Sequence, residues 1–239
     1  MKLKKIASLM LAGIMAVSML TACDTTSNTP DTGDDDQGTT TPVTGYSAKL
    51  AEEMADKSTI AGVKIDWNED NDLQSYLNYE VGNVGYNALT ENFLRSLSGG
   101  NVQYVDTNWA TPRVVTTVLT EMEDDLSVGS ASSTINGLYQ AITGLNPDYD
   151  NYDNDDYNTV LLFVVDNGAS LDNAMDQISG LMYSAVEELD DDYATAGAVS
   201  SMNVDYEYTG SVATSTKTFE SGHGVGVSFI AVEIVRHIA

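Results

Sequence analysis

The chain has 239 residues and a formal net charge of −26, because 36 Asp and Glu residues face only 10 Lys and Arg residues. A negative field of this size repels nucleic acid and anionic lipid head groups, so we expect no nucleic-acid partner. The single cysteine, Cys23, excludes a disulfide within the chain and a metal centre built from several thiolates.

The first 23 residues contain a basic start, an apolar run and a cleavage-site pattern, in that order. Lys2, Lys4 and Lys5 precede an apolar stretch from Ile6 to Leu20, and Thr21-Ala22-Cys23 follows. This is the order of a secretory signal, and the apolar run is short for a membrane span of about 20 apolar residues. Residues 1–23 resemble a bacterial lipoprotein signal peptide with its lipobox.

The resemblance implies where in the cell the protein is located. It implies that residues 1–22 are removed as the signal peptide and that Cys23 receives a diacylglyceryl group. The protein would then be held by its lipid at the extracytoplasmic face of the bacterial cell membrane, because two acyl chains anchor stably where one does not. The part after Cys23 shows no family resemblance of its own.

Residues 23–45 continue from the cysteine as a tract rich in Thr, Asp, Gly and Pro. Such a segment buries too little apolar surface to offset its conformational entropy, so we expect a disordered stalk. From residue 46 to residue 239 the composition is that of an acidic globular domain. A seam between two subdomains, if there is one, is expected near residues 147–158.

In the first half of this domain the apolar spacing predicts mainly helices. Tyr46, Leu50 and Met54 predict a helix, and alternation from Ala61 to Trp67 predicts a strand. A helix over residues 73–84 is expected to be capped by Asp70 or Asn71 and interrupted near Gly82. The next helix is expected to begin at Thr90 and to stop at Gly99 and Gly100.

Residues 102–105 are expected to form a short strand. The segment from Thr111 allows a strand or a helix, and we favour a helix because Thr111-Pro112 forms a good N-cap and N1 pair. Residues 135–142 predict one more helix.

The second half reads as a strand over 159–166, a long helix after Ser170, and three strands over 199–208, 212–219 and 225–238. The last two are expected to join in a hairpin at residues 221–224. The prediction is therefore an α+β fold, with several helices packed on one face of a mostly antiparallel sheet and a C-terminal β-α-β-β-β arrangement.

An Asp-rich segment between residues 147 and 158 is a candidate calcium site. Five carboxylates lie within nine positions, and Ca²⁺ takes six to eight oxygen ligands from flexible loops. The segment does not fit the EF-hand pattern in either register, so a solvated acidic connection is the other interpretation. The candidate ligands are Asp148, Asp150, Asp153, Asp155 and Asp156.

Two further features carry weaker expectations. A cluster of acidic residues at the end of the long helix opposes its dipole, which allows a cation there or simply reflects an acidic composition. Its members are Glu187, Glu188, Asp190, Asp191 and Asp192. Tyr206 and Tyr208 share one face of a predicted strand and suit either sugar stacking or core packing, of which we favour packing.

The sequence assigns no catalytic residue, because none of the common hydrolase motifs is present. We therefore expect a non-catalytic binding or scaffolding module of the cell envelope, with an envelope protein or a carbohydrate as partner. Two alternatives stay open. One is a carboxylate-dependent hydrolase acting on glycan or peptidoglycan, which needs only two suitably spaced acids. The other is a solute-binding lipoprotein.

Overall fold

The structure is a computed structural model that describes residues 45–85, 89–106, 111–126, 137–143, 157–189, 192–194, 203–218 and 226–238. All of these residues belong to one compact unit that runs from Thr44 to Ala239. Within them, none of the helices is long and apolar enough to cross a membrane.

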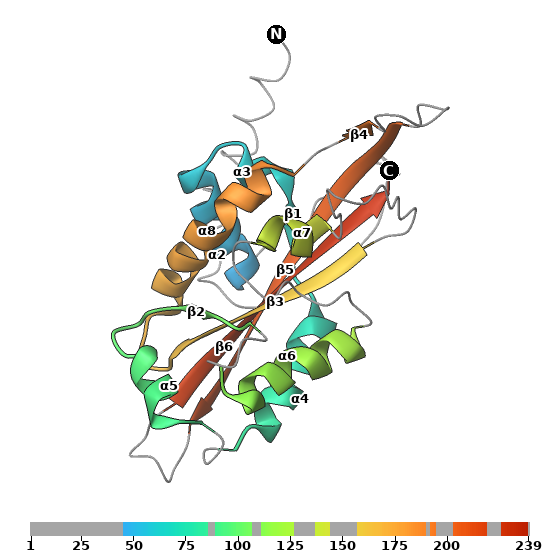
Figure 1. Ribbon diagram of the computed structural model, residues 1–239. Helices are drawn as coiled ribbons and strands as arrows, with labels where there is room; N and C mark the ends of the chain where they lie inside the picture. The colour runs from blue at the N-terminus through green and yellow to red at the C-terminus, as the bar shows by residue number, and fades with distance from the viewer. Residues whose placement is uncertain are drawn as a thin grey trace, which may run out of the picture. The chain divides into compact units, whose positions relative to one another are not determined.

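A mixed sheet forms the centre of this unit (Figure 1). Its order is β1-β5-β6-β3-β2, with β4 paired to β5 off this path; β1 is parallel to β5 and every other pairing is antiparallel. The strands are β1 Asp66–Asn68, β2 Gln103–Tyr104, β3 Tyr157–Asp166, β4 Asp192–Ala194, β5 Asn203–Thr218 and β6 Gly226–Ile238. The α+β class and the mostly antiparallel sheet are therefore confirmed.

Helices pack against both faces of this sheet (Figure 1). The described helices are α2 Gly45–Lys57, α3 Ala61–Lys64, α4 Asn71–Asn83, α5 Glu91–Ser96, α6 Arg113–Asp125, α7 Leu138–Thr143 and α8 Leu171–Glu187. Our expectation of helices on one face was wrong. The continuous apolar run of β3 already indicated a strand buried on both faces.

One face of the sheet packs against α4, α5 and α6. Val160, Leu162 and Val164 of β3 point to this side with Phe229 and Ala231 of β6, and all five belong to one buried cluster. The helices contribute apolar side chains at helical spacing, namely Leu73, Leu77 and Val81 of α4, Phe93 of α5, and Val115, Val118, Leu119 and Met122 of α6. This three- and four-residue spacing is why these segments form amphipathic helices.

The opposite face is covered by α2, α7 and α8. Helix α2 packs on α8 and on β5, and α7 packs on α8, β3 and β6. Ser47 is completely buried in the first turn of α2, and its Oγ accepts a hydrogen bond from the backbone N–H of Val212 at 2.9 Å. That bond fixes the start of α2 directly to β5.

Three predicted strands differ from the structure. Residues 61–64 form the short helix α3, so the predicted strand shrinks to the three residues of β1, and Val63 is 68% exposed. The strands predicted over 199–208 and 212–219 are one strand, β5, which continues through Gly210. Glycine is needed there for packing, because a Cβ at Gly210 would lie 2.8 Å from side-chain atoms of Ile65 and Trp67.

The helix boundaries agree more closely with the sequence. Asp70 caps α4 through its Oδ1, but α4 continues through Gly82 to Asn83. Thr90 caps α5, which is shorter than expected and ends at Ser96. Helix α6 confirms our choice at Thr111, although the N-cap is Pro112. Ser170 is the N-cap of α8, yet its side chain makes no capping hydrogen bond.

Candidate functional site

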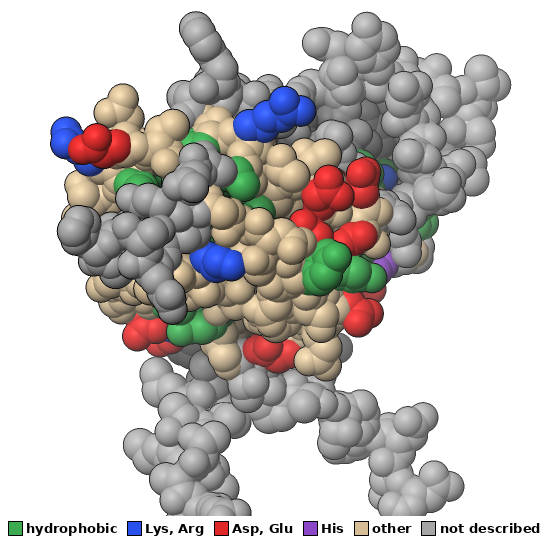
Figure 2. Space-filling model, turned by 90° about the horizontal axis from the view of Figure 1, so that it is seen from below, with side chains coloured by type: hydrophobic (Ala, Val, Ile, Leu, Met, Phe, Trp, Pro, Cys, Tyr) green, Lys and Arg blue, Asp and Glu red, His purple; other side chains and the backbone are tan. Residues whose placement is uncertain are grey.

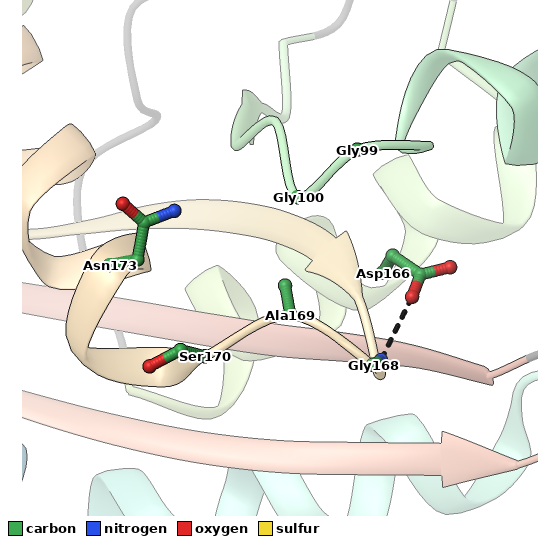
Figure 3. A pocket seen from close by; sticks show the side chains of 7 residues that line it. All are labelled: Gly99, Gly100, Asp166, Gly168, Ala169, Ser170 and Asn173. Atoms are coloured by element: carbon green, nitrogen blue, oxygen red, sulfur yellow. Dashed lines mark hydrogen bonds between the residues drawn. The ribbon is translucent and has the colours of Figure 1, made fainter.

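A hollow of about 390 Å³ lies where the turn after β3 meets the turn before β2. Gly99 and Gly100 line it from one turn, and residues 166–173 line it from the other. Figure 3 shows Asn173 and Asp166 on opposite sides of Ala169, with Gly100 facing them across the hollow.

The glycine side of the hollow requires its two glycines. Gly99 and Gly100 adopt φ values of +86° and +76°, which side-chain-bearing residues rarely adopt. Gln177 of α8 holds this turn in place, because its Nε2 donates to Gly100 O at 2.8 Å and its Oε1 accepts from Val102 N at 3.0 Å. The turn is thus fixed relative to the helix that forms the other wall.

The other wall is the connection from β3 to α8. Asp166 Oδ1 accepts a hydrogen bond from Gly168 N at 2.8 Å, and Ala169 N donates to Asp166 O at 3.0 Å. Ser170 and Asn173 then begin α8. The first N–H groups of a helix have no partners within it, and no side-chain cap at Ser170 takes them here.

The residues that line this hollow offer mainly hydrogen-bonding groups to a ligand. It combines backbone groups, the Ser170 hydroxyl, the Asn173 amide and the Asp166 carboxylate. Asp166 is the one carboxylate among the described residues that line the hollow, so these residues do not supply the pair of acids that glycoside hydrolysis requires. Such a lining suits a polar ligand that is held in place.

A second polar group of residues lies inside the α4 face of the sheet, around Glu233 of β6. Glu233 is only 5% exposed. Its Oε1 accepts a hydrogen bond from Asn158 Nδ2 at 2.6 Å, and its Oε2 accepts one from Ser211 Oγ at 3.3 Å. Asn158 belongs to β3 and Ser211 to β5, so this carboxyl group joins the three central strands.

The fourth member of this group is Asp70, the N-cap of α4. Asp70 Oδ1 accepts from Asp72 N at 2.7 Å and from Leu73 N at 3.0 Å, which leaves its second oxygen for Glu233. Burial is the main cause that raises the pKa of Glu233, and the charge of Asp70 and a hydrogen bond with Asp70 raise it further. Glu233 therefore binds a proton more readily than an exposed glutamate does.

The predicted site residues mostly fall where the structure gives no description. Cys23, the hairpin turn at 221–224 and the candidate calcium ligands Asp148, Asp150, Asp153, Asp155 and Asp156 all lie outside the described residues. Across the described ranges, no group of three His, Cys, Asp or Glu side chains could hold a metal ion.

Two sets of predicted residues can be placed. Tyr206 and Tyr208 are 6% and 4% exposed, so core packing is confirmed for them. Glu187 at the end of α8 accepts a hydrogen bond from Ser58 Oγ at 3.1 Å. This contact ties α8 to the end of α2.

The Asp70–Glu233 pair was missed at the level of sequence. The available signal was a single acidic residue inside the apolar run from Gly226 to Ile238. A lone carboxyl group in a strand buried on both faces must find partners there, because an unpaired buried charge is costly. The glycine-lined hollow had no comparable signal, since its two turns are about 70 residues apart in sequence.

Comparison with known proteins gives no match to any family model, curated protein or solved structure.

Proposed function

We propose that the protein is a lipid-anchored extracytoplasmic surface protein whose folded domain is a non-catalytic binding or scaffolding module of the cell envelope. The anchor is the lipid on Cys23, and the stalk of residues 23–45 separates it from the domain. The partner is an envelope protein or a carbohydrate. The order of basic start, apolar run and cysteine supports the anchoring part of this proposal.

The observation that carries the binding part is the composition of the glycine-lined hollow. It presents an amide, a hydroxyl, backbone groups and one carboxylate, which match the hydroxyl groups of a carbohydrate. Gln177 fixes one wall to the other, so the hollow is formed before a ligand arrives. Preorganisation of this kind lowers the entropic cost of binding.

Metabolic labelling with a fatty-acid probe tests the anchor. In a bacterial host, the wild-type chain should incorporate the probe and partition with membranes. Cys23→Ser should lose both properties, whereas the nearby control Thr26→Ser should keep them. Equal labelling of the wild type and Cys23→Ser would contradict lipidation at Cys23.

Binding to a panel of soluble glycans and peptidoglycan fragments tests the module. Asn173→Ala should weaken binding about tenfold, because it removes one good hydrogen-bonding side chain from the hollow. Asn78→Ala, an exposed amide on α4, is the matched control. Turnover of any of these substrates that disappears in Asp166→Asn would contradict a non-catalytic module.

The carboxylate-dependent hydrolase is the second candidate, and the Asp70–Glu233 pair is the observation that favours it. The pair places two carboxyl groups side by side, one of them with a raised pKa, as general acid catalysis by carboxyl groups requires. Its burial counts against it, because Glu233 is 5% exposed and a glycan must reach both groups. The turnover assay separates the two candidates when Glu233→Gln is included. The third candidate, a solute-binding lipoprotein, also remains a proposal, and the same binding assay tests it.

A further inference from the structure

We propose that Asp70 and Glu233 form a proton-dependent latch, which fastens the N-terminus of α4 to the central strands when Glu233 is protonated and releases it when Glu233 ionises. This inference is independent of the proposed function, since it concerns a conformational device and no ligand.

The contacts place the latch where four elements meet. Glu233 of β6 is held by Asn158 of β3 at 2.6 Å and by Ser211 of β5 at 3.3 Å, and its carboxyl group reaches Asp70. Asp70 in turn accepts hydrogen bonds from the backbone amides of Asp72 and Leu73, which lie in the first turn of α4. A single proton between two carboxyl groups therefore connects the sheet to the start of a helix.

When Glu233 is protonated, each hydrogen-bond donor around the pair has an acceptor. Asn158 and Ser211 donate to Glu233, and the protonated Glu233 hydroxyl donates to Asp70. Without that proton, the buried carboxylate of Glu233 faces the partly exposed carboxylate of Asp70, and the two like charges repel each other. Glu233 is fixed on the central strand of the sheet, so Asp70, at the chain's entry into α4, is the group that moves.

Asp70 is the charged group that raises the pKa of Glu233. β3 presents the neutral Asn158 and Val160, and β5 presents Ser211. Other charged and titratable groups lie farther along the same face or along α4. They are Asp66, Asp72, Glu207 and His237, with His237 Nε2 3.1 Å from Thr209 Oγ1, together with Glu80 near the far end of α4 and Lys217, whose Nζ donates to Gly82 O at that end.

Glu80 supplies the internal control, because it is a second buried acid on the same helix. Burial and the charges of Glu121 and Asp125 on α6 raise the pKa of Glu80, so it also titrates above the ordinary range for an acid. It lies near the C-terminal end of α4, far from the first turn. Glu80→Gln removes one ionisable carboxyl group from α4 and leaves Asp70 and Glu233 unchanged.

The test follows the exchange of the Leu73 backbone amide, which donates to Asp70, in the full-length chain held in a mild detergent. Amide hydrogen exchange is measured at about pH 5 and about pH 8.5 and corrected for the intrinsic dependence of exchange on pH. In the wild type, protection of Leu73 should fall about tenfold for each unit by which closing the latch raises the pKa of Glu233.

The variants decide the outcome. Glu233→Gln should hold Leu73 protection constant with pH, since the neutral amide cannot ionise. Asp70→Asn should do the same, because asparagine caps helices as well as aspartate does and brings no second charge. Glu80→Gln should keep the wild-type response. Constant Leu73 protection in the wild type would overturn the latch, and so would a wild-type pH response in both Glu233→Gln and Asp70→Asn. Loss of the pH response in Glu80→Gln alone would overturn it as well.

Discussion

Gly210 shows how one residue determines the packing of a whole sheet edge. It lies opposite Trp67 of β1 in the parallel pairing with β5. Trp67 is 4% exposed because its ring covers the space where a side chain at position 210 would stand. The missing Cβ thus makes room for the largest side chain of β1.

We predict that Gly210→Ala destabilises the protein by about 1–3 kcal/mol, the usual cost of forcing extra atoms into a packed core. The new Cβ would lie 2.8 Å from Ile65 Cγ2 and from Trp67 Cε3. The control is Gly82→Ala on α4, where nothing lies within 4 Å of the added methyl group, and which should stabilise by up to about 1 kcal/mol. Urea unfolding of both variants measures the difference, and equal stabilities would contradict the packing argument.

Arg236 is a second residue whose environment explains its neighbours. It is 1% exposed, and its guanidinium lies 4.8 Å from the ring centroid of Tyr206 and 5.7 Å from that of Tyr157. A desolvated cation over an aromatic face is stabilised by about 2 kcal/mol or more. Tyr206, one of the two tyrosines that suggested sugar stacking, therefore contacts a buried cation instead.

At the scale of the element, the outer edge of β5 is satisfied by side chains of helices. Beyond the three residues paired with β1, Val212 N donates to Ser47 Oγ of α2. Gln74 of α4 then bonds both polar groups of Thr214, donating to its O at 2.9 Å and accepting from its N at 3.2 Å. A glutamine amide here replaces the backbone of a neighbouring strand. Open strand edges invite pairing with another chain, so this arrangement protects the sheet.

We predict that Gln74→Ala leaves the Thr214 backbone groups open and causes self-association that rises with protein concentration. The folded state should also lose about 1–2 kcal/mol, the cost of two polar groups without partners. Ser75→Ala is the control, because Ser75 Oγ bonds only the carbonyl of Asn71 within its own helix. Sedimentation velocity measures the association. A monomeric Gln74→Ala protein at high concentration would contradict the role given to Gln74.

The elements that the sequence predicted well are those with a long uniform period. Helix α8 and strand β3 follow directly from their apolar spacing, since their environment is the same along their length. The short α3 was missed because Ala61, Val63 and Ile65 alternate as in a strand, while packing on α2 and α8 favours a helical turn. Local periodicity contains no information on that packing. The Asp70–Glu233 pair was missed for the same reason, because it depends on which strands become neighbours.

At the scale of the whole molecule, acidity dominates the surface. Figure 2 shows a group of carboxylates at the right of the face seen there and others spread along its edges, while Lys and Arg side chains occur singly. Some ion pairs of the described basic residues lie at the surface, such as Lys57–Asp176 and Arg95–Glu91. Exposed pairs of this kind contribute at most about 1 kcal/mol each. Self-repulsion at a net charge of −26 is therefore poorly compensated by the protein itself.

We predict that added cations stabilise the chain by screening, so that Ca²⁺ and Mg²⁺ at equal millimolar concentration raise the melting temperature equally. Thermal unfolding with EDTA as the reference measures this. A rise specific to Ca²⁺ would contradict pure screening and would indicate a built site, since a ligand at about 100 times its Kd adds about 2.7 kcal/mol. Loss of that rise in Asp153→Asn and Asp155→Asn would then assign it to the Asp-rich segment.

The bond between Ser47 and Val212 also has a mechanical consequence. Ser47 lies two residues after Gly45, where α2 begins, and it is the first completely buried side chain of that helix. A pull on the chain from its N-terminal side therefore loads the sheet at β5 before it can unwind α2. Strand β5 passes that load to β6 over 13 paired residues, from Tyr206–Ile238 to Thr218–Gly226. The domain can thus bear tension at its N-terminal end through its longest strand ladder.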